Sequence, residues 1–163
     1  MDRTMDMRKQ LLSSEKCSFH TLITADYGDE QYAFQMDCSA TGDGCLSFTV
    51  TDPETICGIT GTISDDGAAL TFDDQVLAFP MLADGQVTPV SAPWLFLNTL
   101  KSGYLTGCSK EENGLLLYID DSYEEHPLRL QIRIDESNAP VYAEIFWQER
   151  RVLALEIQNF TTE

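Results

Sequence analysis

The sequence predicts a single, mainly-β domain in which an antiparallel sheet curves around one or two helices. Most of the chain alternates apolar and polar residues with a period of two, which is typical of half-buried strands. Short turns rich in glycine, aspartate and asparagine join these segments, so neighbouring strands should run antiparallel. A flat sheet of about ten strands would expose long edges and a wide apolar face, so we expect it to curl into a half-barrel around the helices.

The first half of the chain predicts a helix followed by a strand meander. Residues 1–16 are polar and helix-friendly, with methionine and leucine side chains along a loose stripe. From Cys17 the period changes to two, and residues 17–79 form the first meander, in which an Asp66-Gly67 pair marks a tight hairpin turn. Two short strands, at 70–72 and 76–79, complete this half.

The second half begins with the clearest helix in the chain, residues 91–102. Ser91 is a typical N-cap, Pro93 occupies the first turn, and Gly103 follows the last residue. The body of this helix is apolar nearly all round, so other elements must cover it on most sides. Residues 104–160 then predict a second meander, and we expect one domain over residues 1–163.

The chain is strongly acidic, with 27 acidic and 10 basic side chains and a net charge of −17, although 43% of its residues are apolar. A chain of this length can bury a core without disulfides or a metal ion. The charge excludes broad contact with nucleic acid or with an anionic membrane, because both would repel it. Most carboxylates fall in turns and at solvent-facing strand positions, where they favour solubility and discourage edge-to-edge pairing.

The cysteines and the first residues bear on the compartment. Residues 1–7 lack the apolar stretch of a secretory signal, and no apolar run is long enough to span a bilayer. Five cysteines are too few and too scattered for a disulfide scaffold. Cys38 and Cys45 flank a glycine-rich turn and are the one pair that we nominate, with ordinary half-buried thiols as the alternative.

The sequence carries no catalytic or metal-binding signature. The two histidines, His20 and His126, have no cysteine or serine placed as in a known nucleophile motif, and an enzyme would require one of them to face a cysteine or carboxylate in a cleft. The acidic doublets at 65–66, 73–74 and 120–121 do not match the spacing of a calcium loop and lie in or near turns. We therefore expect no enzymatic activity, no metal and no cofactor.

The order of elements resembles the LolA/LolB-like lipoprotein-carrier fold. The residues that carry the resemblance are the leading helix into 17–26, the strand end Phe48-Thr49-Val50-Thr51-Asp52-Pro53 with 58–63, the helix start Ser91-Ala92-Pro93-Trp94, and 140–145, Arg151 and Ile157-Gln158-Asn159-Phe160. The resemblance spans almost the whole chain and is greatest to envelope lipoproteins of Gram-positive bacteria. It implies a half-barrel of ten to eleven strands, an exported protein, and a concave cavity for acyl chains or another apolar ligand.

The apolar residues of the 91–102 helix and of the facing strands are the candidate ligand-binding residues: Phe19, Ile23, Tyr32, Phe34, Met36, Leu46, Phe48, Val50, Trp94, Phe96 and Leu97. We expect a monomer that binds or carries a lipid, another hydrophobic small molecule or a lipidated protein by burying it between sheet and helices, with displacement of the helix opening the site. The alternative is a structural or protein-interaction module of the envelope, in which the same residues form a closed core beneath the acidic surface.

This function predicts an extracytoplasmic, membrane-anchored lipoprotein if a leader was removed, and a cytoplasmic protein otherwise. Membrane contact would occur only through a lipid anchor that this chain does not carry.

Overall fold

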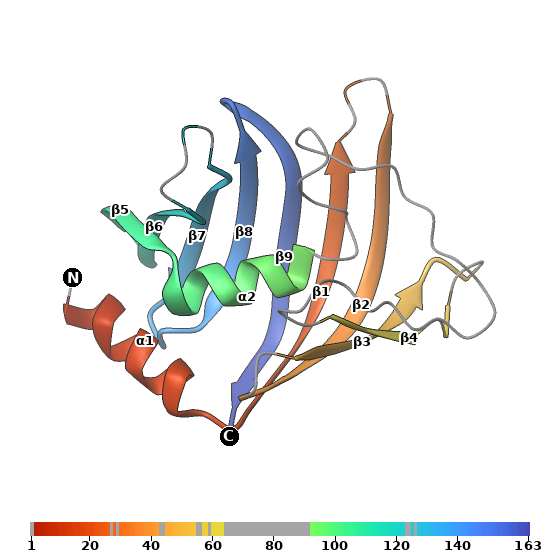
Figure 1. Cartoon of the computed structure of the whole chain (residues 1–163), viewed down its shortest axis with the longest axis horizontal. Coiled ribbons are helices and arrows are strands. Elements are labelled where there is room, and N and C mark those ends of the chain that lie inside the picture. Colours follow the sequence, from red (N-terminus) through yellow and green to blue (C-terminus); the bar gives the residue numbers. More distant parts are fainter. Residues whose placement is uncertain are drawn as a thin grey trace.

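A computed structural model describes residues 2–26, 28, 30–42, 45–54, 57–58, 60–63, 92–122, 125 and 127–163. Within these ranges the chain forms one curved antiparallel sheet with two helices, which confirms the predicted fold class (Figure 1). The elements are α1 (Asp2–Ser13), β1 (Lys16–Asp26), β2 (Gln31–Thr41), β3 (Leu46–Asp52), β4 (Thr60–Ile63), α2 (Ala92–Ser102), β5 (Tyr104–Glu111), β6 (Gly114–Asp120), β7 (Arg129–Asp135), β8 (Pro140–Trp147) and β9 (Arg150–Thr162). The strands expected at 70–72 and 76–79 lie outside the described residues.

The nine described strands form two meanders that meet in the middle of the sheet. Their order is β4-β3-β2-β1-β9-β8-β7-β6-β5, and every described pair is antiparallel. Hairpin connections account for the neighbours within each meander. The central pair is different, because β1 and β9 come from opposite ends of the chain and lie side by side, with Ile23 opposite Leu155 (Figure 1).

The concave face of the sheet is the apolar one. Alternate residues of β1 are buried, as the period of two predicts. A row of side chains crosses six adjacent strands and is at most 1% exposed; it consists of Leu117, Ile132, Ala143, Leu155, Ile23 and Phe34. This row joins both meanders into one hydrophobic core.

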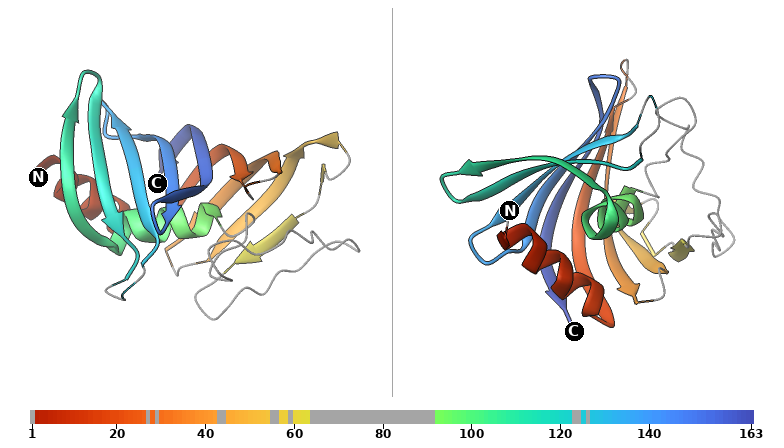
Figure 2. Two further views of the ribbon diagram at one scale, coloured as in Figure 1. Left: turned by 90° about the horizontal axis from the view of Figure 1, so that it is seen from above. Right: turned by 60° about the vertical axis from the view of Figure 1, so that its left-hand side comes forward.

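Helix α2 lies across this concave face, packed against β6, β7, β9 and α1 (Figures 1 and 2). Phe96 and Leu100 are fully buried, and Leu95 and Leu97 are nearly so. The helix is thus covered on most sides, as its apolar composition predicts. Neither of the two described helices is long and apolar enough to cross a membrane.

A clamp from α1 fixes the C-terminal end of α2. The Arg8 Nη2 donates to the carbonyl oxygen of Gly103 at 2.8 Å and lies 3.5 Å from that of Thr99. Burial lowers the pKa of Arg8 below its ordinary value. Gly103 also permits close packing, because a Cβ there would lie 2.6 Å from Ile119 Cγ2. The guanidinium therefore satisfies the Gly103 carbonyl just beyond the helix end, whereas the Thr99 carbonyl already accepts the Gly103 amide at 2.7 Å.

None of the five cysteines forms a disulfide, so the nominated pair Cys38–Cys45 is not formed. The register explains this, because Cys38 lies opposite Phe48 within the sheet, whereas Cys45 hydrogen-bonds through its carbonyl to Thr41 at the hairpin end. Burial raises the pKa of Cys17 to about 11 and raises that of Cys38 as well, so both thiols stay protonated at neutral pH.

Candidate functional site

Nine of the eleven residues expected to line a cavity are buried in the hydrophobic core. Each is at most 4% exposed; they are Phe19, Ile23, Phe34, Met36, Leu46, Phe48, Val50, Phe96 and Leu97. Trp94 is half-buried at the edge of this cluster, and Tyr32 is 42% exposed near the start of β2. The structure thus brings α2 and the expected strand residues together, and their role in ligand binding stays a prediction.

Three aromatic rings, from α2, β1 and β9, pack together in the core. The ring of Phe19 meets that of Phe96 edge-on, with centroids 5.8 Å apart and an interplanar angle of 79°. On its other side Phe19 stacks with Phe160 of β9, again at 5.8 Å between centroids. Phe160 was not among the expected residues, because its contact depends on the pairing of the first and last strands. These contacts are typical of a well-packed core.

A small pocket marks the seam between α2 and the β2–β3 hairpin. Its volume is about 20 Å³, and three of the expected residues line it: Leu46, Trp94 and Leu97. Thr41, Asn98 and Lys101 also line it, so polar side chains stand beside the apolar ones at this seam. A space of this size holds about one water molecule. An apolar ligand of several carbons would therefore require α2 to move away from the hairpin.

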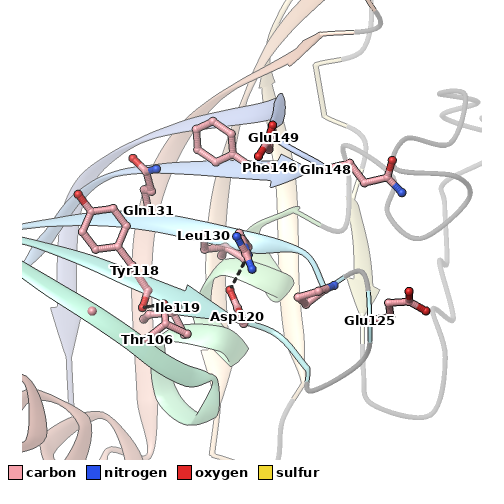
Figure 3. Close-up of a pocket in the computed structure, with 13 residues that line it drawn as sticks. Thr106, Tyr118, Ile119, Asp120, Glu125, Leu130, Gln131, Phe146, Gln148 and Glu149 are labelled. Atoms are coloured by element: carbon pink, nitrogen blue, oxygen red, sulfur yellow. Dashed lines mark hydrogen bonds and ion pairs between the residues drawn. The ribbon is translucent and has the colours of Figure 1, made fainter.

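A larger cleft of about 690 Å³ lies on the other face of the sheet, turned away from α2 (Figure 3). Its floor includes Tyr118, Gln131 and Phe146, which alternate along β6, β7 and β8 with buried core residues. Glu125 and the β8–β9 turn stand at its rim. None of the eleven expected residues lines this cleft. The signal in the sequence was weak: two aromatic residues at positions that the alternation assigns to solvent.

His20 lies on the same outer face of the sheet, beside a carboxylate. Its Nδ1 is 2.7 Å from Asp37 Oδ1, and its Nε2 is 2.8 Å from Gln35 Oε1. Burial lowers the pKa of His20, but the hydrogen bonds to Asp37 and Gln35 outweigh it, so the pKa lies above its ordinary value. Both ring nitrogens of His20 are thus hydrogen-bonded to neighbouring side chains of β2 on the outer face of the sheet.

The groove beside His20 is shallow and polar. It has a volume of about 420 Å³, and Ser18, Ser39 and Ser47 are among its lining residues. Cys38 belongs to the same stretch of β2, but its side chain is 4% exposed and follows the buried alternation of that strand. No cysteine thiol therefore faces the imidazole from β2. His126 lies outside the described residues.

No three histidine, cysteine, aspartate or glutamate side chains in the described part of the chain gather as metal ligands. The doublet at 120–121 serves the local structure instead. Asp121 Oδ1 accepts a hydrogen bond from the Leu128 amide at 2.9 Å, and Asp120 pairs with Arg129. The doublets at 65–66 and 73–74 lie outside the described residues.

No protein-family model matches the sequence, and no curated protein matches it. Among solved structures, the chain is similar to a LolA superfamily protein from Nitrosomonas europaea, at 7% identity over 98% of this chain and 93% of that one, with a TM-score of 0.48. It is similar to an uncharacterized conserved protein from Thermus thermophilus, at 10% identity over 99% and 86%, with a TM-score of 0.49.

A putative outer membrane lipoprotein-sorting protein domain from Vibrio parahaemolyticus is also similar, at 10% identity over 98% of this chain and 91% of that one, with a TM-score of 0.44. The solved structures to which this chain is similar thus include a LolA-superfamily protein.

Proposed function

We propose that the protein binds a hydrophobic or lipid-like ligand, without enzymatic chemistry, between α2 and the concave face of the sheet. The observation that carries the proposal is the position of α2. It is a short, mostly buried helix that covers the apolar face of an open sheet, and the seam beside it is lined by residues that include Leu46, Trp94 and Leu97. Moving this helix would uncover a continuous apolar surface that a ligand could cover in its place.

The free energy gained by burying a lipid chain and the free energy lost by uncovering α2 are of similar size. Each methylene that leaves water contributes about 0.8 kcal/mol, so a chain of about twelve methylenes supplies roughly 10 kcal/mol. Uncovering the four large buried side chains of α2, from Leu95 to Leu97 with Leu100, costs roughly 6–12 kcal/mol at 1.5–3 kcal/mol each. Uptake would therefore be reversible, which suits a carrier.

The surface charge restricts how a lipid could arrive. A chain of net charge −17 would not lie flat on an anionic bilayer, so an acyl chain would enter tail first at the seam. We place this monomeric carrier in the cell envelope, held at the membrane only through an anchor. The order of elements, which resembles that of envelope lipoproteins, supports this placement.

Tryptophan fluorescence tests the proposal, because the chain has only two tryptophans. Trp147→Phe leaves Trp94 at the α2 seam, whereas Trp94→Phe leaves Trp147 at the end of β8. Titration with a fatty acid brominated in mid-chain should quench Trp94 strongly and Trp147 weakly. Equal quenching of both variants, or none in either, would refute a site at the seam. Lipid extraction and mass spectrometry of the purified protein would identify a natural ligand.

The second candidate is an interaction module with a closed core. The burial of nine expected cavity residues at 4% exposure or less favours it. This candidate predicts no co-purifying lipid, no quenching of Trp94, and a melting temperature that fatty acids leave unchanged.

A further inference from the structure

The cleft on the outer face of the sheet has an aromatic floor. Tyr118 of β6 lies opposite Gln131 of β7 in the strand register, and Phe146 of β8 lies opposite Arg129, two residues along β7 from Gln131. Figure 3 shows the Gln131 side chain between the two rings. All three side chains are half-buried, so their faces are open to a ligand. A volume of about 690 Å³ is within the usual range of small-molecule sites.

The charges around this floor are unbalanced. Four arginines on β7 and β9 are neutralised: Arg129 by Asp120 at 3.4 Å, Arg133 by Glu111 at 3.3 Å, Arg150 by Asp26 at 3.3 Å and Arg151 by Glu144 at 3.1 Å. Among the described residues, no arginine, lysine or histidine forms an ion pair with Glu125 or Glu149 at the rim. The cleft lining therefore carries two more negative than positive charges.

Two irregularities of the backbone shape the cleft. The two-residue β8–β9 turn places Gln148 and Glu149 at φ values of 48° and 70°, in the left-handed region that favours glycine or asparagine, and both side chains line the cleft. On the opposite side, a register shift in β5 sets Thr106 out of the ladder, and its hydroxyl donates to the Tyr118 carbonyl at 3.1 Å. Gly107 follows, and its missing side chain leaves the Tyr118 ring uncovered.

We propose that this cleft binds an organic cation, namely a guanidinium or ammonium group on an apolar stem. The faces of aromatic rings attract cations, the rim carboxylates supply opposite charge, and the Gln131 amide oxygen can accept a hydrogen bond. A bare metal ion is excluded as the ligand, because the carboxylates stand at the rim while aromatic carbon forms the floor. The site lies on the opposite face from the proposed apolar site and does not depend on it.

Calorimetric titration with a matched pair of ligands tests the charge requirement. A blocked Gly-Arg-Gly tripeptide should bind the intact chain, and the same tripeptide with citrulline, which has nearly the same shape and no charge, should bind at least tenfold more weakly. Affinity for the arginine peptide should fall as salt rises, because the rim is solvent-exposed. Equal affinity for the arginine and citrulline peptides would overturn the proposal.

Four variants locate the site. Glu149→Gln should weaken binding about threefold, as loss of an exposed charge contact does, and Phe146→Leu should weaken it by a similar factor through loss of the aromatic face. Arg129→Gln should strengthen binding about threefold, because it removes the positive charge of the cleft lining. Glu112→Gln, in the β5–β6 turn away from the cleft, changes the net charge equally and should leave affinity unchanged. Thermal unfolding confirms that each variant folds.

The pattern of results decides the outcome. If Glu112→Gln weakens binding as much as Glu149→Gln, the attraction is that of the whole acidic surface and the cleft is not a site. A parallel titration with choline distinguishes the source of the cation. If choline and the peptide bind with equal affinity, the natural ligand is a free small cation. If the peptide binds tenfold more tightly, the ligand is a basic side chain of a partner protein. Both results support a cation site in the cleft.

Discussion

At the scale of single residues, His20 should make the stability of the protein depend on pH. Its pKa in the folded state lies above its ordinary value, despite partial burial, because Asp37 and Gln35 accept hydrogen bonds from it. A group whose pKa is higher in the folded than in the unfolded state stabilises the folded protein when it is protonated. This stabilisation is complete below the unfolded pKa, about 6.5 for histidine, and is lost as the pH rises through the folded pKa. Lowering the pH through this range therefore increases the contribution of His20 to the free energy of unfolding.

We expect His20→Gln to reduce the free energy of unfolding more at pH 5.5 than at pH 8.5, as measured by urea denaturation at both values. Asp37→Asn serves as the matched variant, because it removes the partner and should abolish the same pH-dependent difference. A loss that is equal at the two pH values would show that the imidazolium pair does not contribute to stability.

At the scale of elements, the clamp formed by Arg8 of α1 on the end of α2 should contribute clearly to the stability of the fold. Arg8→Ala removes the hydrogen bond from a charged donor to the Gly103 carbonyl at 2.8 Å. We expect a loss of about 1.5–3 kcal/mol in the free energy of unfolding, the usual range for hydrogen bonds to charged groups. Urea denaturation measures this loss.

Lys9→Ala is the matched control, because Lys9 is the next residue of the same helix and is exposed. Its effect should stay within about 0.5 kcal/mol. If both variants lose the same free energy of unfolding, the clamp does not contribute to stability. If α2 is also the element that a ligand displaces, Arg8→Ala should in addition take up more of an environment-sensitive apolar dye than Lys9→Ala does.

At the scale of the whole molecule, the excess of negative charge should oppose folding. A net charge of −17 on a compact surface produces self-repulsion, and dissolved salt screens it with a Debye length of about 10 Å at 0.1 M. Raising NaCl from 20 to 500 mM should therefore raise the melting temperature by about 2–4 °C, equivalent to roughly 1 kcal/mol. KCl should act equally. A melting temperature that falls with salt would mean that surface ion pairs such as Arg151–Glu144 outweigh the repulsion.

The sequence alone determined what depends on near neighbours. Alternation along 17–26 predicts a strand that is apolar on one face, and an apolar segment with its own start and stop residues predicts the helix at 91–102. Turn residues predict hairpins and hence two antiparallel meanders. These patterns were sufficient for the fold class and for most buried residues, because burial follows the face of a strand or helix.

Only the tertiary structure decided what depends on residues far apart in the chain. The pairing of β1 with β9, the stacking of Phe160 on Phe19, and the contact of Phe96 in α2 with Phe19 in β1 all join such residues. The cleft between Tyr118 and Phe146 likewise arises where four strands, β5 to β8, and two connecting segments meet. Periodicity shows that a side chain is buried, but the space left beside it is set by the neighbours that the fold supplies.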